Sequence, residues 1–168
     1  MSAHPIVAAA QALDDDFKFF SGKPPEAHHV AELEGELGRP LHPEHRALVE
    51  ACGAAAILAK DEVWPPPEAY EVRPYWQMIR GIELFGPLPP NHPLSVLGAR
   101  ARVPSELVPV GKLVGAARYL CATADGGIVW WSRDGVEPTA GFEAEVLAFL
   151  AQLAIDKDRV KREGIQRG

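Results

Sequence analysis

Two histidines have the most suggestive spacing of any residues in this sequence. His42 and His45 are three positions apart, so on a helix their imidazole rings would lie on adjacent turns of one face. A zinc ion requires three or four ligands with hydrogen-bonding groups behind them. His28 and His29 are the nearest further candidates, and no cluster of Cys or His completes such a set. The sequence therefore predicts no metal site, and we expect these histidines to lie at helix starts and to face water.

The two cysteines lack the surroundings of a nucleophile. Cys52 is expected at the C-terminal end of a helix, where the negative end of the helix dipole raises the pKa of a thiol. Cys121 falls in an apolar stretch that predicts a buried strand. They form no C-x-x-C pair, so two buried free thiols are favoured over a disulfide between them.

No catalytic motif is apparent in the sequence. It contains no G-x-S-x-G elbow, no P-loop and no G-x-G-x-x-G stretch. Carboxylate pairs such as Glu34 with Glu36 are typical of surface charge, since nothing in the sequence indicates the burial that would shift their pKa. We therefore expect a protein without enzymatic activity and without a cofactor. An enzyme of unrecognised type is the least favoured alternative.

Aromatic and acidic residues gather around a run of three prolines, Pro65-Pro66-Pro67. Trp and Tyr are enriched at the energetic centres of protein interfaces, because each buries a large rigid area and keeps a polar group. The alternative is that these aromatic rings pack in the core and under loops. We interpret this stretch as a partner-binding surface displayed on a loop. This acidic–aromatic segment consists of Asp61, Glu62, Trp64, Glu68, Tyr70 and Glu71.

Charge is unevenly distributed along the chain, whose formal net charge is −6. Residues 26–71 hold ten acidic side chains against three basic ones, whereas residues 157–168 hold five basic side chains against two acidic ones. Binding of nucleic acid requires a basic surface that neutralises phosphates, so we do not expect direct binding to nucleic acid. The basic end is typical of a solvated helix end.

The bulk properties predict a cytoplasmic globular protein. A chain of 168 residues is long enough for one domain with a substantial core. No apolar run approaches the roughly 18 residues that cross a bilayer. Residues 1–12 contain no Lys or Arg to form the basic region of a signal peptide. We expect no membrane interaction, and the sequence does not indicate an oligomeric state.

Helical periodicity and punctuation predict four helices. Apolar spacing favours one amphipathic helix within residues 1–20. A second helix is predicted over residues 25–37 and a third over residues 40–53, and each ends at a glycine. A last helix carries an apolar stripe over residues 142–153, and we expect Thr139 to cap it.

Between the third and last helices the pattern favours strands. Residues 54–64 and 79–85 are expected to form strands, and residues 107–110 a further one. Pro109 indicates that this further strand lies at a sheet edge, because proline cannot donate a ladder hydrogen bond. Residues 118–132 predict a β-hairpin around an Asp-Gly-Gly turn. Helices, then strands, then a helix are typical of an α+β fold.

Several of these stretches, taken in order, resemble the SUKH superfamily. The family's opening, in which one helix ends in Leu-Gly and the next begins at a Pro, is similar to AELEGELGRPLHPEH. The matching stretches are residues 31–45 and 47–53, the strand LVPVG at 107–111, the hairpin sequences YLC and DGGIVW, and residues 142–153. Two features depart from the family pattern. His42 interrupts the usual Leu-Pro step, and Gly53-Ala54 lacks a second glycine or asparagine.

The resemblance implies a central, mostly antiparallel sheet flanked by helices. It covers about residues 26–153 and divides the chain into an N-terminal helical extension (1–22), a SUKH-like domain (23–156) and a basic C-terminal tail (157–168). The family has no shared catalytic residue, and the role that it implies is protein binding.

The family's members suggest two kinds of partner. Many are bacterial immunity proteins that neutralise a polymorphic toxin, often a nuclease or a deaminase, and an acidic inhibitor is steered towards the basic cleft of such a toxin. Fungal members are interaction scaffolds in the regulation of cell-wall synthesis. The sequence therefore predicts an immunity-type protein, with an intracellular scaffold or regulatory module as the alternative.

Overall fold

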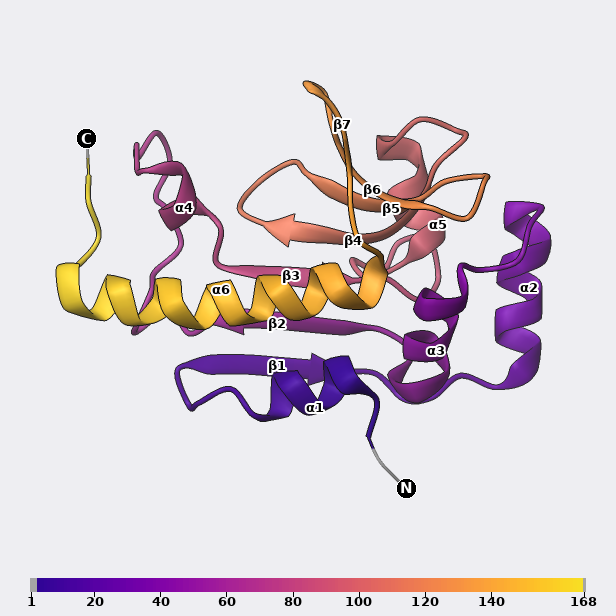
Figure 1. Ribbon diagram of the computed structural model, residues 1–168, viewed down its shortest axis with the longest axis horizontal. Helices are drawn as coiled ribbons and strands as arrows, with labels where there is room; N and C mark the ends of the chain where they lie inside the picture. The colour runs from indigo at the N-terminus through magenta and orange to yellow at the C-terminus, as the bar shows by residue number, and fades with distance from the viewer. Residues whose placement is uncertain (1–2, 168) are drawn as a thin grey trace.

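A seven-stranded antiparallel sheet forms the frame of the molecule, in a computed structural model that describes residues 3–167. Each strand pairs with the next one in the sequence, so the sheet order is β1-β2-β3-β4-β5-β6-β7 (Figure 1). The strands are β1 (Phe17–Ser21), β2 (Ala55–Ala59), β3 (Gly81–Leu84), β4 (Val108–Val114), β5 (Tyr119–Ala122), β6 (Ile128–Ser132) and β7 (Gly135–Pro138). The predicted α+β architecture with an antiparallel sheet is confirmed.

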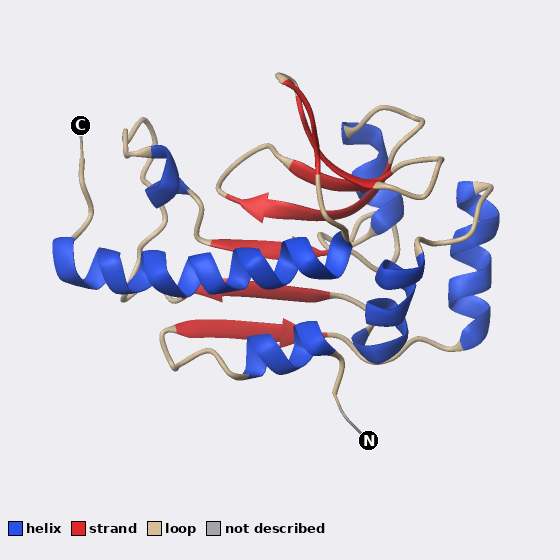
Figure 2. Ribbon diagram, in the orientation of Figure 1, coloured by secondary structure: helices blue, strands red, loops and turns tan. Residues whose placement is uncertain are grey.

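Most helices lie on one face of the sheet or at the ends of the molecule, while the short helix of residues 96–99 contacts β4 on the side of the opposite face. They are α1 (Pro5–Gln11), α2 (Ala27–Leu37), α3 (Pro43–Cys52), α4 (Tyr75–Met78), α5 (Val96–Ala99), the 3-10 turn η1 (Arg100–Arg102) and α6 (Phe142–Glu163). Figure 2 shows α6 running along the sheet, while α2 and α4 lie at opposite ends of the long axis. α1, α3 and α4 all contact α6.

The core lies between α6 and the sheet face that it covers. Strand register places Ile57, Ile82 and Leu113 side by side on this face, and all three are buried. α6 contributes a buried apolar stripe that begins at Phe142 and includes Leu150. The predicted stripe is therefore confirmed, because apolar residues at helical spacing face the sheet.

The predicted N-terminal helix ends earlier than expected. It stops at Gln11, and Phe17 begins β1, which pairs with β2 along its whole length. An acidic turn separates the two elements, in which the Asp14 carboxylate accepts a hydrogen bond from the Asp16 amide at 3.0 Å. The prediction of one helix was wrong from this turn onward, because a turn competes with continuation of the helix. Residues 17–21 are consequently an edge strand of the main sheet.

β4 lies in the interior of the sheet, between β3 and β5, so its predicted edge position was wrong. The pairing of β4 with β5 shifts register between Pro109 and Gly111. A bulge of this kind accommodates a proline that cannot donate to the ladder. The predicted hairpin over residues 118–132 is confirmed as β5 and β6.

The two ends of α6 also differ from expectation. Thr139 does not cap the helix. Instead the Phe142 amide donates to Glu44 of α3 at 3.2 Å, while Thr139 bonds the carbonyl of Ile128 at 2.7 Å. At the other end, Lys157 is buried rather than solvated, with its ammonium 2.9 Å from Asp16. The helix therefore continues past residue 157 as part of the packed structure.

Candidate functional site

The acidic–aromatic segment lies on the connection between β2 and α4, and its tryptophan is buried. Trp64 has no exposed surface, and its Nε1 donates to the Gln77 carbonyl at 2.9 Å. Arg80 donates to the Trp64 carbonyl at 2.6 Å. The expectation that a loop displays Trp64 was wrong, because the ring packs under the loop and meets Trp76 edge to face at 6.2 Å. Trp64 therefore supports the loop from beneath by packing.

Arg73 supports the loop from within. Its side chain is fully buried and donates to the Pro65 carbonyl at 2.7 Å and to the Pro66 carbonyl at 3.3 Å. It also donates to the Glu71 carboxylate at 2.9 Å. A guanidinium with several fixed acceptors holds the surrounding backbone in one arrangement. The proline run and the following turn are therefore fixed relative to each other.

Three apolar side chains stand out from this supported loop, residues 65–75, which we name the Tyr70 loop. Tyr70 is fully exposed and has a positive φ of 64°. Val72 and Tyr75 are also exposed. A bulky side chain at positive φ is strained, and the surrounding structure must hold it there. The loop therefore presents three exposed apolar or aromatic side chains on a backbone that Arg73 supports from within.

Not all carboxylates of the segment are free to meet a partner. Glu71 is mostly buried and pairs with Arg73 and with Arg167 of the C-terminal end. Asp61 is exposed but lies 2.8 Å from Arg80. Within this segment, the exposed carboxylates that have no cation partner among residues 3–167 are those of Glu62 and Glu68. Asp61, Glu71 and buried Trp64 therefore make contacts within the protein that support the loop.

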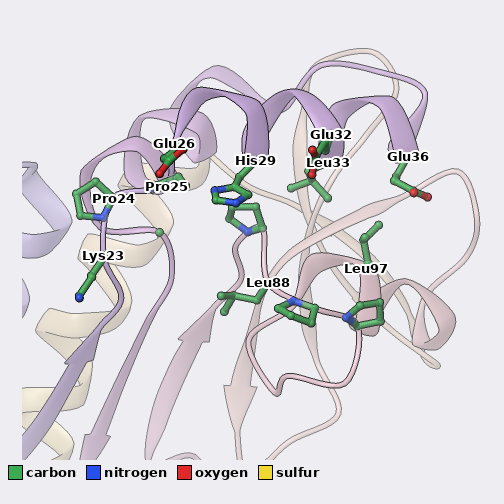
Figure 3. A pocket seen from close by; sticks show the side chains of 14 residues that line it. Lys23, Pro24, Pro25, Glu26, His29, Glu32, Leu33, Glu36, Leu88 and Leu97 are labelled. Atoms are coloured by element: carbon green, nitrogen blue, oxygen red, sulfur yellow. The ribbon is translucent and has the colours of Figure 1, made fainter.

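A groove at the opposite end of the molecule was not predicted. It has a volume of about 640 Å³ and lies between α2 and the loop of residues 87–90. Figure 3 shows α2 along one side, with Leu97 of α5 pointing towards it from the other. Its lining residues are Lys23, Pro24, Pro25, Glu26, His29, Glu32, Leu33, Glu36, Gly53, Pro87, Leu88, Pro89, Pro90 and Leu97. Its size lies within the range of about 300–1,000 Å³ that is usual for ligand sites.

Close backbone contacts hold the two sides of the groove together. A Cβ added at Gly53, whose φ is +78°, would lie 2.6 Å from the Lys23 carbonyl oxygen. A Cβ added at Gly86 would lie 2.1 Å from the Gly53 carbonyl oxygen. Buried Ser95 caps α5 and donates to the Leu88 carbonyl at 2.8 Å. The chain before α2 and the loop after β3 are therefore anchored to a common base.

Negative charge lines the α2 side of this groove. Glu26, Glu32 and Glu36 contribute three carboxylates, against a single ammonium from Lys23. Glu26 lies 3.3 Å from His28, whereas within residues 3–167 no ion pair involves Glu32 or Glu36. From the sequence, Glu32 and Glu36 were expected to lie with Glu34 on a solvated face of the helix. The four-residue spacing from Glu32 to Glu36 can be read from the sequence. The groove cannot, because its opposite wall is formed by residues more than fifty positions further along the chain.

His45 is buried rather than facing water, so that expectation was wrong. Its Nε2 lies 2.8 Å from the Phe85 carbonyl, and its ring meets Phe142 edge to face. Burial lowers the pKa of His45 to about 4, despite the opposing effect of this hydrogen bond. Within residues 3–167, no group of three or more His, Cys, Asp or Glu side chains is arranged to hold a metal ion.

Both cysteines are buried free thiols, as predicted. Burial raises the pKa of Cys121 to about 12 and also raises the pKa of Cys52. A thiol must ionise to act as a nucleophile, so neither is activated at neutral pH.

No protein-family model matches the chain, and no curated protein matches it significantly. Within the described residues, no helix has the length and apolar character needed to span a bilayer.

Proposed function

We propose that this chain is a non-enzymatic protein-binding domain of the SUKH immunity type, which acts in the cytoplasm by covering a polymorphic toxin. The observation that carries the proposal is the Tyr70 loop. Its central tyrosine is fully exposed at a positive φ, and the same loop also carries exposed Val72 and Tyr75. Surface apolar side chains held together on a rigid base are typical of interface centres. The entropic cost of binding is reduced when internal contacts such as those of Arg73 already hold the loop in one conformation.

Charge supports a basic partner. The chain has a formal net charge of −6, and Glu62 and Glu68 are exposed in the segment that precedes the tyrosine. A negative surface increases the rate at which a positively charged cleft is encountered, and this effect weakens as salt screens it. Nuclease and deaminase toxins present such clefts to their substrates, so the proposed partner is a toxin of this kind.

The partner is identified by affinity capture with the full chain, beginning with the product of the neighbouring toxin-like reading frame. A complex that inhibits the toxin supports the immunity proposal. Capture of housekeeping proteins instead, with no effect of the chain on any neighbouring toxin, would favour a scaffold or regulatory module and refute neutralisation.

Two substitutions test the surface in the resulting complex. Tyr70→Ala should weaken binding by about 2 kcal/mol, roughly thirtyfold, as at other interface centres. Glu62→Gln with Glu68→Gln should slow association at low salt and leave dissociation nearly unchanged. Ile155→Ala is the matched control, because Ile155 is an exposed apolar residue on α6. Equal affinity of Tyr70→Ala and the control would exclude the Tyr70 loop as the contact surface.

A further inference from the structure

The groove between α2 and the loop of residues 87–90 has two chemically different sides. On α2, Glu32 and Glu36 are exposed and Glu26 stands at the helix start. Facing them are proline rings, Leu88 and Leu97, while buried Leu33 of α2 also lines the groove. A ligand that fits both sides must carry positive charge along one edge and apolar groups along the other.

We propose that this groove binds an extended segment of another protein in which basic and apolar side chains alternate. In an extended chain, successive side chains point to opposite sides and every second one returns to the same side after about 6.6 Å. Glu32 and Glu36 are one helical turn apart, which is about 6 Å along the helix axis. Alternate lysine or arginine side chains therefore meet successive carboxylates, while the intervening apolar side chains meet the proline wall.

The length of the groove fits a short segment. Glu26 and Glu36 are ten positions apart along the α2 wall, which is about 15 Å at the rise of an α-helix. Four or five residues of extended chain cover that distance at about 3.3 Å each. A segment of seven residues thus reaches past both ends.

The glutamates of the groove favour a positively charged ligand. Glu32 and Glu36 have no ion-pair partner within residues 3–167, so a basic segment supplies one without displacing an internal pair. The basic C-terminal end of this chain does not compete, since Arg167 pairs with Glu71 at the opposite end of the molecule. The inference goes beyond the proposed function, because it concerns a separate surface and does not depend on a toxin.

The test uses the full chain and three labelled peptides. One alternates four lysines with three leucines, the second has the same composition as a lysine block followed by a leucine block, and the third replaces lysine with glutamate. Fluorescence anisotropy should show binding of the alternating peptide, weakened by salt, and at least tenfold weaker binding of the other two. Amide chemical shifts should change along α2 and the loop of residues 87–90.

Matched variants locate the contact. Glu32→Gln with Glu36→Gln should weaken binding of the alternating peptide by about five- to tenfold, since exposed ion pairs each contribute modestly. Glu62→Gln with Glu68→Gln removes the same charge at the other end and should leave peptide affinity unchanged. Leu88→Ala should weaken binding by about threefold or more, and circular dichroism verifies that each variant is folded.

Several outcomes would overturn the proposal. Equal affinity for the alternating and blocked peptides would mean that only charge matters. Equal effects of the two glutamate pairs, or shifts centred on the Tyr70 loop, would place binding elsewhere. Absence of binding at millimolar peptide would also reject it, and none of these outcomes bears on whether the Tyr70 loop contacts a toxin.

Discussion

Acid should destabilise this protein through one buried imidazole, His45. A carbonyl oxygen can only accept a hydrogen bond, so the contact with Phe85 places the proton on Nε2. Nδ1 is buried and has no hydrogen-bond partner among the described residues. Protonation would therefore put an uncompensated positive charge inside the core. This is why burial holds the pKa at about 4.

The direction and size of the effect follow from proton linkage. Between pH 6.5 and 4 the unfolded chain binds a proton at His45 that the folded chain does not bind. The contribution of the neutral His45 ring to the free energy of unfolding is thus fully present above pH 6.5, and it is lost as the pH falls towards 4. A pKa lowered from 6.5 to about 4 corresponds to about 3 kcal/mol of unfolding free energy, at about 1.4 kcal/mol for each pH unit.

The perturbation is His45→Gln, because glutamine can still donate to the Phe85 carbonyl but does not titrate. Urea unfolding is measured at intervals from pH 7 to pH 4. The unfolding free energy of the wild type should fall by about 3 kcal/mol more than that of His45→Gln over this range. His29→Gln removes an exposed imidazole and should leave the steep fall in place. Parallel curves for the wild type and His45→Gln would refute the reasoning.

Three further substitutions test the scaffold by urea unfolding at pH 7. Lys157→Ala should cost about 2 kcal/mol, because it removes a buried ammonium that joins α6 to Asp16; no loss would mean that the pair contributes nothing. Gly86→Ala should cost about 3 kcal/mol, since its Cβ would lie 2.1 Å from the Gly53 carbonyl oxygen, and wild-type stability would contradict the close approach. Ser95→Ala should cost about 1–2 kcal/mol through loss of a helix cap and of a loop anchor, and unchanged stability would indicate that neither bond matters.

Local signals in the sequence were sufficient to predict the elements whose ends are marked by proline or glycine. α3 (Pro43–Cys52) lies within the predicted range and stops at Gly53, and α2 stops at Gly38, which has the left-handed conformation that favours glycine. The hairpin follows from its Asp-Gly-Gly turn. In each case the residues that specify the conformation lie within the element or next to it. Such signals act over a few residues and do not require knowledge of the tertiary structure.

Long-range packing explains the failures. Phe17 continues a helical spacing in sequence, but its strand forms because β2 is available to pair with it. Pro109 is compatible with an interior strand once a bulge is allowed. His45 and Trp64 look like surface residues until Phe85 and Gln77, respectively, supply their buried partners. Tertiary contacts determine the conformation and burial of these residues, and such contacts cannot be read from local propensity or from residue spacing.

The candidate surfaces were predictable to different degrees. Tyr70 was predicted from the sequence to be a contact residue, whereas its positive φ and the buried arginine that supports its loop required coordinates. The groove was not recognised, because its walls combine residues near 23–36 with residues near 87–97. A row of glutamates on one helix indicates only a solvated face until an apolar wall stands opposite.

The two surfaces should act independently, because they lie at opposite ends of the long axis and have separate supports (Figure 1). The Tyr70 loop depends on Arg73, whereas the groove depends on the glycine contacts at Gly53 and Gly86. α6, with 22 residues, is about 33 Å long and extends along the sheet between them. Substitutions separated by more than about 7–10 Å without shared partners have additive effects. If one partner occupies both surfaces, the losses from Tyr70→Ala and from the Glu32/Glu36 pair should therefore sum in free energy. A combined loss clearly smaller than the sum would show that the two ends are coupled through the sheet.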